Sequence, residues 1–310
     1  MPVKQTRKKI DFLSLLDFER AELDEILRQA EGLKRAWREG SGEVPLAGRV
    51  LGLVFHKPSL RTRLSFEVGM RQLGGSAVYI TDQEIGFGKR EAIKDIGAVM
   101  SRYLDAIMIR TFSQEHVVQL AGAARIPIIN GLTDWVHPCQ VLADLFTLRE
   151  RGHDLDDLRI AYLGDGNNVV QSWIHAAIPY GFDLRVATPA GYEPDAEAVA
   201  RVAAEGRGRV SLLRDPVEAV AGAQVIYTDT WTSMGQEAEA EKRGALFPPY
   251  QINSELLAGA APGAHVMHCL PAHRGEEITD EVIDGPQSIV YDQAENRLHA
   301  QKGILLHCLA

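Results

Sequence analysis

The sequence predicts an α/β protein with two domains, each built on a central, mainly parallel sheet flanked by helices. Two observations lead to this prediction. Short apolar runs typical of buried strands alternate with helical patterns along the 310 residues, an order that favours parallel sheets covered by helices on both faces. The alternation also breaks and restarts near Gly152, which indicates two successive units of ordinary domain size.

The first half opens with a helical pattern over residues 14–38, in which leucine, isoleucine and phenylalanine recur at helical spacing. Four short buried strands, with helical patterns between them, are expected over residues 50–55, 77–80, 106–109 and 127–129. After a loop at residues 130–134, a long helix over residues 138–150 ends at Arg151-Gly152. We therefore expect the first domain to span residues 1–152.

The second half repeats the alternation of strand and helix patterns. Its strand candidates are residues 159–163, 184–187, 210–213, 225–228 and 265–270. The last segment, residues 293–309, again has a helical pattern. We expect the second domain to span residues 153–292.

Composition limits the classes of function. The chain is 45% hydrophobic and 24% charged, and its net charge of −9 disfavours binding to nucleic acid or to an anionic membrane. No apolar run approaches the length of a membrane span. Its three cysteines form neither a disulfide framework nor a paired-cysteine zinc motif, and no apolar signal core follows the basic N-terminus. We therefore expect a cytoplasmic protein.

A cluster of hydroxyl groups and guanidinium groups follows the first predicted strand. Ser59-Leu60-Arg61-Thr62-Arg63 opens a helical pattern directly after Pro58. A helix N-terminus offers free N–H groups and partial positive charge, and added hydroxyls and arginine forks suit such a site to phosphate. We expect Lys57, Arg61 and Arg63 to supply its positive charge. The alternative is a serine N-cap followed by solvent-facing arginines.

Further polar residues stand at the predicted carboxyl ends of strands, where open parallel sheets bind ligands. They are Arg110, His137, Asn167, Asn168, Asp229 and Cys269. We expect these residues to converge on one cleft between the two domains.

His137-Pro138-Cys139-Gln140 begins the predicted helix 138–150, because proline suits the first helical position. From there the His137 ring and the Gln140 amide could donate hydrogen bonds to a carbonyl oxygen. The alternative for His137 is an N-cap in a hydrated loop.

Asp229-Thr230-Trp231-Thr232-Ser233-Met234-Gly235 follows the predicted strand 225–228. An aspartate at a strand end can bind an ammonium group, and the alternative is a surface turn with an Asx cap. Further along, His268 and His273 flank Cys269, but their spacing matches no zinc pattern. A reactive thiol at Cys269 is favoured over metal binding, and a buried inert cysteine is the alternative.

The segment Gly164-Asp165-Gly166-Asn167-Asn168-Val169 follows a strand, as a dinucleotide-binding motif would. Val169 stands where that motif needs a small residue, and the next strand ends without the acidic residue that binds ribose. A nucleotide site is therefore disfavoured, and the asparagines are better suited to a small carboxylate or carbonyl group.

Four segments together, residues 59–63, 137–140, 229–235 and 268–271, resemble the ornithine carbamoyltransferases within the aspartate/ornithine carbamoyltransferase superfamily. The resemblance implies transfer of the carbamoyl group of carbamoyl phosphate to the δ-amine of L-ornithine, giving L-citrulline and phosphate, with no metal or organic cofactor. It also implies a carbamoyl-phosphate-binding domain followed by an ornithine-binding domain. The C-terminal helix 293–310 is expected to pack back on the first domain, and the catalytic unit is expected to be a homotrimer.

The resemblance also implies the binding residues. Those for carbamoyl phosphate are Ser59, Leu60, Arg61, Thr62, Arg110, His137, Gln140, Cys269, Leu270 and Arg297. Those for ornithine are Asn168, Asp229, Ser233 and Met234. The residues expected to act in catalysis are Arg110, His137, Cys269 and Arg297. The chain departs from many relatives at Leu60, where they have threonine, and at Gly86, where they have glutamine, although Gln83 is near.

Three alternatives stay open at this point. A carbamoyltransferase acting on another amine, such as aspartate, N-acetylornithine or putrescine, would share most of these motifs. A two-domain protein that only binds a small anion would share the architecture, but would not need a cysteine, a histidine and several arginines at one centre. A nicotinamide enzyme is disfavoured by the residues around Val169.

Overall fold

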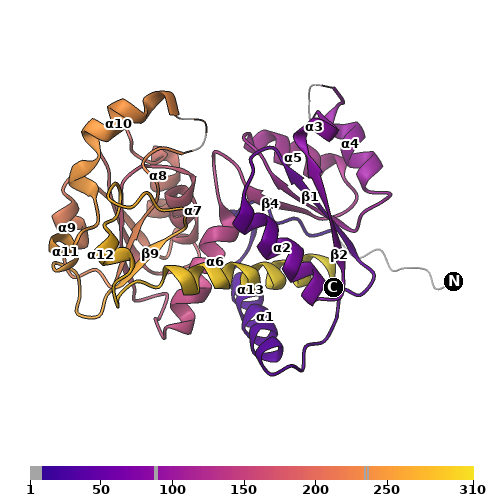
Figure 1. Cartoon of the computed structure of the whole chain (residues 1–310), viewed down its shortest axis with the longest axis horizontal. Helices are drawn as coiled ribbons and strands as arrows, with labels where there is room; N and C mark the ends of the chain where they lie inside the picture. The colour runs from indigo at the N-terminus through magenta and orange to yellow at the C-terminus, as the bar shows by residue number, and fades with distance from the viewer. Residues whose placement is uncertain (1–8, 87–89, 234, 236) are drawn as a thin grey trace. The chain divides into compact units, whose positions relative to one another are not determined.

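The computed structural model describes residues 9–86, 90–233, 235 and 237–310. They form two compact units, Met1–Cys139 with Leu298–Ala310 (unit 1) and Gln140–Arg297 (unit 2). Each unit is a parallel sheet with helices on its faces, which confirms the predicted fold class (Figure 1). The division into domains at residue 152 stays a prediction.

The sheet of unit 1 has four parallel strands in the order β2-β1-β3-β4. They are β1 (Val50–Phe55), β2 (Ser76–Thr81), β3 (Ala106–Arg110) and β4 (Ile128–Leu132). The four predicted strands are all present. The predicted loop at 130–134 is partly wrong, because Asn130 to Leu132 continue β4 and are buried. The polar Asn130 fits there since its amide donates to the backbone oxygen of Leu13 at 3.0 Å.

Helices cover both faces of this sheet. They are the 3-10 helix η1 (Leu15–Asp17), α1 (Arg20–Arg38), α2 (Leu60–Gln72), α3 (Asp82–Ile85), α4 (Ile93–Met100), α5 (Gln114–Ala123) and the last part of α13 (Val290–Leu309). The helices α4 and α5 lie on one side of the strands and α2 on the other (Figure 1). Apolar residues of α4 and α5, such as Ile96 and Leu120, pack on Val54, Ile107 and Ile109 of the strands.

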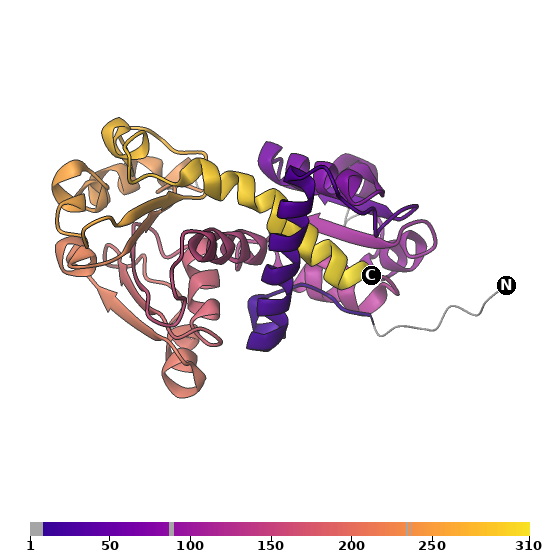
Figure 2. The same ribbon diagram turned by 90° about the horizontal axis from the view of Figure 1, so that it is seen from below.

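The end of α13 packs closely against α1 and α2 within unit 1 (Figures 1 and 2). Two glycines permit this approach. A Cβ atom on Gly303 would lie 2.6 Å from the backbone oxygen of Ile26, and one on Gly69 would lie 3.3 Å from Cγ of Lys302. Lys302 donates to the side chain of Gln72 at 3.0 Å, and burial lowers its pKa to about 8. The C-terminal residues are thus part of the core of unit 1.

The sheet of unit 2 has five parallel strands in the order β7-β6-β5-β8-β9. They are β5 (Arg159–Leu163), β6 (Asp183–Ala187), β7 (Arg209–Leu213), β8 (Val225–Thr228) and β9 (His265–His268). All five were predicted, but the last ends two residues early. Leu270 has a φ of 57°, in the left-handed region that a strand does not use, so the chain turns after His268.

The helices of unit 2 include the predicted α6 (Pro138–Glu150), which belongs to this unit from Gln140 onward. The others are α7 (Asn168–Ala176), α8 (Ala196–Glu205), α9 (Pro216–Val220), η2 (Glu237–Glu239), α10 (Ala240–Leu246), η3 (Pro248–Tyr250), α11 (Ser254–Leu257), α12 (Asp280–Ile283) and α13 up to Arg297. The helices α9 and α12 pack on one face of the sheet, around Ile226 and Val266. Among the described residues, no helix is long and apolar enough to cross a membrane.

We expect Gly303→Ala to lower the free energy of unfolding of unit 1 by about 1–3 kcal/mol, because the new methyl group would force α13 away from the backbone of α1. Urea-induced unfolding followed by circular dichroism measures this. Gly122→Ala in α5 is the matched control: no atom lies within 4 Å of its added Cβ, so the higher helix propensity of alanine should stabilise by up to about 1 kcal/mol. Equal stabilisation by both substitutions would contradict the close packing.

Candidate functional site

The N-terminus of α2 in unit 1 is capped by Ser59. Its Oγ accepts a hydrogen bond from the backbone N–H of Thr62 at 3.3 Å, and its hydroxyl donates to Oγ1 of Thr62 at 3.1 Å. The N-cap that sequence analysis offered as the alternative is therefore present. An N-cap does not oppose an anion site, since Leu60 and Arg61 still belong to the first turn, where backbone N–H groups have no partner within the helix. Leu60 is 70% exposed, so only its backbone suits a polar ligand.

Arg110 lies at the same edge of the sheet as this helix start. It is the last residue of β3 and stands beside Phe55, the last residue of β1. The backbone N–H of His56 donates to the Arg110 oxygen at 2.9 Å, so the strand ends stay paired up to the turn into α2. Parallel pairing thus places Arg110 next to the segment that leads to Ser59.

Two of the three cations predicted to supply positive charge form ion pairs with acidic side chains. Lys57 is buried, forms an ion pair with Asp134 and lies 4.4 Å from the ring centre of Phe112. Arg63 binds Glu67 at 3.2 Å and stacks over Tyr79. These ion pairs make Lys57 and Arg63 weaker candidates for binding an anion, because acidic side chains already partner their charges.

Arg61 differs from both of these cations. Its Nε is buried and has no hydrogen-bond partner among the described residues. A buried guanidinium N–H without an acceptor is costly. Arg61 is therefore the cation of this cluster best placed to bind an anion.

His137 is buried directly before Pro138, the first residue of α6, as predicted. The turn before it is held by Thr133, whose Oγ1 accepts from the backbone N–H of Trp135 at 3.3 Å and of Val136 at 3.2 Å. Cys139 is also buried, and its thiol donates to the backbone oxygen of Asn130 at 3.3 Å. The turn and the helix start together fix the backbone at His137.

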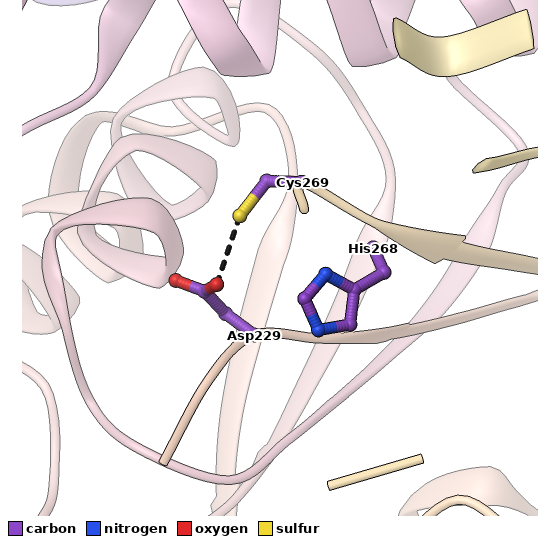
Figure 3. Close-up of side chains that lie close together, drawn as sticks. All are labelled: Asp229, His268 and Cys269. Carbon is purple, nitrogen blue, oxygen red and sulfur yellow. Dashed lines mark hydrogen bonds between the residues drawn. The ribbon is translucent and has the colours of Figure 1, made fainter. Parts of the chain in front are cut away.

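Asp229 is the centre of a hydrogen-bonded group in unit 2 (Figure 3). Its carboxylate accepts from the Cys269 thiol at 2.8 Å, from Nδ2 of Asn167 at 2.8 Å and from the backbone N–H of Thr230 at 2.8 Å. Burial, and then the negative charge of Asp229, raise the pKa of Cys269 well above its usual range. Cys269 is therefore a neutral thiol that donates a proton to a hydrogen bond, and the predicted reactive thiolate is not favoured.

Asn167 contacts Asp229 through its side-chain NH2 group. Its Oδ1 caps α7 by accepting from the backbone N–H groups of Val169 and Val170, which turns its NH2 group toward Asp229. Asn168 is the first residue of α7 and is partly exposed. Sequence analysis grouped the two asparagines but could not assign these different roles.

His268 uses both nitrogens of its ring. Nδ1 accepts from the backbone N–H of Leu270 at 2.8 Å, so the neutral ring has its hydrogen on Nε2, which donates to Glu277 at 2.9 Å. Glu277 is fully buried and also accepts from the backbone N–H of His273 at 2.6 Å. The backbone after Cys269 is held by this pair.

Within the described part of the chain, two groups of side chains are close enough together to hold a metal ion: Asp229, His268 and Cys269, and His273, Glu276 and Glu277. In the first group, metal binding would break one of the two ring hydrogen bonds of His268 and displace the thiol proton of Cys269. In the second group, Glu276 and His273 are exposed and Glu277 is bound to His268. The residues present are poorly suited to a metal ion.

A second buried group surrounds Asp144, which sequence analysis did not identify. Its Oδ1 accepts from Nε2 of Gln140 and Nε2 of Gln293, both at 2.8 Å, and its Oδ2 accepts from the hydroxyl of Tyr227 at 2.9 Å. Burial raises the pKa of Asp144 to about 7, and these hydrogen bonds and the positive charge of Arg297 oppose that shift. The spacing of four residues between Gln140 and Asp144 on one helix was the only sign in the sequence.

This group corrects the expectation for Gln140. Its NH2 group already donates to Asp144, whereas its Oε1 is buried and has no hydrogen-bond partner among the described residues. Gln140 therefore offers an acceptor to a ligand and not the predicted donor. Arg297 of α13 is buried near Asp144.

The segment after Asp229 is held by Arg243 of α10. Arg243 is buried, binds Asp165 at 3.0 Å and donates to the backbone oxygen of Trp231 at 2.7 Å. Burial raises the pKa of Asp165 to about 6, although Arg243 opposes this shift. Ser233 is partly exposed beyond this anchor, and Met234 lies outside the described residues.

Two further predictions concern loops: the position of Gly86 and the glycine-containing segment after β5. Gly86 ends α3 with a φ of 57°, a left-handed conformation that favours glycine over the glutamine of many relatives. Gln83 is exposed, and residues 87–89 lie outside the described part of the chain. In unit 2, a Cβ on Gly166 would lie 2.4 Å from the backbone of residues 192–194, so the chain fills the space that a dinucleotide motif leaves to a pyrophosphate.

We expect Asp229→Asn to increase the rate of Cys269 alkylation by iodoacetamide at pH 8 by on the order of 10-fold, because removing the negative neighbour lowers the thiol pKa and the thiolate reacts. Mass spectrometry of the Cys269 peptide measures the rate, with buried Cys139 as internal reference. The control is Asp280→Asn, which removes an exposed carboxylate. An unchanged or slower rate in Asp229→Asn would show that Asp229 does not hold the thiol proton.

Comparisons with known proteins agree along nearly the whole chain. Residues 10–150 match the family model "Aspartate/ornithine carbamoyltransferase, carbamoyl-P binding domain", and residues 156–308 match "Aspartate/ornithine carbamoyltransferase, Asp/Orn binding domain". The ornithine carbamoyltransferase of Symbiobacterium thermophilum is 54% identical over 98% of this chain and 99% of its own. The anabolic ornithine carbamoyltransferase of Pseudomonas aeruginosa is 51% identical over 95% of both chains.

Solved structures give the same result. The ornithine carbamoyltransferase from Pyrococcus furiosus superposes with a TM-score of 0.93 at 49% identity and covers 96% of both chains. The enzyme from Thermus thermophilus has a TM-score of 0.88 at 44% identity, over 97% of this chain and 99% of its own. The chain belongs to the aspartate/ornithine carbamoyltransferase family.

Proposed function

We propose that this chain is an ornithine carbamoyltransferase, which transfers the carbamoyl group of carbamoyl phosphate to the δ-amine of L-ornithine and releases L-citrulline and phosphate. The observation that carries the proposal is the similarity, over nearly the full length, to relatives that bear this name. The chemistry of the two candidate groups agrees with it. Unit 1 offers hydroxyls and an arginine suited to phosphate, and unit 2 offers a carboxylate suited to an ammonium group.

The phosphate end of the first substrate is assigned to Ser59, Leu60, Arg61, Thr62 and Arg110. The first turn of α2 supplies backbone N–H groups, and the arginines supply charge that a doubly negative phosphate requires. Arg61 contributes most, because its buried Nε finds no acceptor among the residues that the structure describes and is left to bind an anion.

The carbamoyl group is assigned to His137, Gln140 and Arg297, with the backbone of Cys269 and Leu270. As the amine attacks the planar carbon, negative charge grows on the carbamoyl oxygen and then moves to the departing phosphate. His137 and Arg297 are the donors for this oxygen, and donors that are oriented in advance stabilise such charge most strongly. Gln140 accepts a hydrogen bond from the carbamoyl NH2 group through its Oε1.

Ornithine is assigned to Asn168, Asp229, Ser233 and Met234. Asp229 attracts an ammonium group, and three hydrogen-bond donors hold its carboxylate in one orientation. The attacking δ-amine must itself be neutral, because an ammonium has no lone pair. The neutral Cys269 thiol fits this requirement, since it adds no charge that would keep that amine protonated.

The alternative acceptors are less well supported. Putrescine has no carboxylate for Asn168 to bind, and a free α-amino group suits Asp229 better than an acetylated one. For the assembly we propose a homotrimer located in the cytoplasm, on the family resemblance alone, and light scattering of the purified protein tests the trimer.

A panel of amines tests the acceptor. Purified protein is incubated with carbamoyl phosphate and, separately, L-ornithine, N-acetylornithine, putrescine or aspartate, and the ureido product is measured. We expect citrulline from ornithine to exceed every other product by at least about 100-fold in kcat/KM, since a site that binds both α-groups leaves its buried polar groups unpaired with a shorter or blocked amine. If another amine were turned over as fast as ornithine or faster, the proposal that ornithine is the substrate would be wrong.

We expect Arg61→Ala to lower kcat/KM for carbamoyl phosphate by about 100-fold to 1,000-fold, because the phosphate loses its buried guanidinium. Steady-state kinetics of citrulline formation measures the loss. Arg63→Ala is the matched control on the same helix: its side chain binds Glu67 and Tyr79, so kcat/KM should stay within about twofold. Similar losses in both variants would mean that a general change of charge, and not the position of Arg61, explains the effect.

A further inference from the structure

The carboxylate of Asp144 decides which end of the Gln140 amide is offered to a ligand. The two ends of a glutamine amide have nearly the same shape but opposite hydrogen-bonding character. Above its pKa of about 7, Asp144 is a carboxylate, which accepts only, so the group of Gln140 that faces it must be NH2, at the observed 2.8 Å. The oxygen is then the end without a hydrogen-bond partner among the described residues.

The same carboxylate orients a second amide. Gln293 donates from Nε2 to Asp144 at 2.8 Å and to the Tyr227 hydroxyl at 3.1 Å, which leaves its Oε1 to accept from the backbone N–H of His268 at 2.9 Å. His268 directly precedes Cys269 and Leu270, which are assigned to the carbamoyl group. One buried carboxylate therefore fixes a side chain and a strand end that serve the same substrate.

Stability alone does not explain this arrangement. Asp144 is fully buried, and burying a carboxylate is so unfavourable that its pKa rises to about 7. An apolar side chain of similar size would avoid that cost, but it could not orient either amide. The charged and titratable side chains around Asp144 are Arg297 of α13, Tyr227 of β8 and Cys269 after β9.

We propose that Asp144 is a positioning residue that determines specificity: by binding the NH2 group of Gln140, it makes Gln140 an acceptor that selects the carbamoyl NH2 group. The proposal rests on the proposed function. Acetyl phosphate has the same phosphate and carbonyl groups with a methyl in place of NH2, so it cannot use that acceptor. Discrimination between the two acyl phosphates is then the property that depends on Asp144.

The experiment measures the dissociation constant of carbamoyl phosphate and the inhibition constant of acetyl phosphate in matched variants. In Asp144→Leu, which is close in size but accepts no hydrogen bond, carbamoyl phosphate should bind about 10-fold more weakly while acetyl phosphate changes by less than about twofold. In Asp144→Asn, Oδ1 can still accept from both glutamines, so the discrimination should be kept. In Tyr227→Phe, which removes a second acceptor of Gln293 but leaves Gln140 bonded to Asp144, the discrimination should also be kept.

A merely structural role would weaken both acyl phosphates by the same factor in Asp144→Leu, and that result would overturn the proposal. Loss of discrimination in Asp144→Asn or Tyr227→Phe would also overturn it. Should Asp144→Leu not fold, Asp144→Ala replaces it, because alanine also accepts no hydrogen bond. Citrulline formation by the wild-type enzyme distinguishes a failure of this proposal from a failure of the proposed function. If that enzyme forms citrulline from ornithine but Asp144→Leu keeps its discrimination, only the role of Asp144 fails; if it forms no citrulline, the proposed function itself fails.

Discussion

Buried carboxylates must be supplied with hydrogen-bond donors, and in unit 2 this requirement holds the side chains of Gln140, Asn167 and Cys269 in place. Asp144, Asp165, Asp229 and Glu277 are all buried. Their donors come from a glutamine pair, an arginine, an asparagine with a thiol, and a histidine, respectively. Because an unsatisfied buried charge costs several kcal/mol, each of these donors is held in one orientation. The positions of the candidate side chains follow from that constraint.

Unit 1 has the opposite requirement: its hydrogen-bond donors must stay unpaired until a phosphate binds. A phosphate site needs donors that stay unpaired until the ligand binds, and acidic side chains near such a site would compete with the phosphate. Lys57 and Arg63 form ion pairs with acidic side chains, whereas Arg61 keeps a buried N–H group that has no acceptor in the described part of the chain. Backbone N–H groups at the start of α2 add donors that carry no net charge. A chain with a net charge of −9 can bind an anion in this way without a general positive surface.

The sequence predicted the strands well, because a parallel strand buried on both faces needs a continuous apolar run. Prediction failed where the outcome depends on a partner far along the chain. Gln140 was expected to donate, but its orientation is set jointly with Gln293, and that pair meets only in the folded unit. For Lys57, nothing in the neighbouring sequence showed that Asp134 would form an ion pair with it. Motifs thus identified candidate residues, while the hydrogen bonds that orient them required the fold.

The orientation of the Gln140 amide by a buried charge also affects how an enzyme rejects a compound that has the same shape as its substrate. A methyl group and an NH2 group differ little in volume, so the walls of a pocket separate them poorly, whereas an acceptor with no alternative partner separates them well. A glutamine that could rotate would lose this advantage, because it could turn its oxygen to another donor when a methyl group arrives. The bond from Gln140 to Asp144 prevents that rotation. On the role proposed for Asp144, the desolvation cost of one carboxylate supports selectivity at a neighbouring, uncharged side chain.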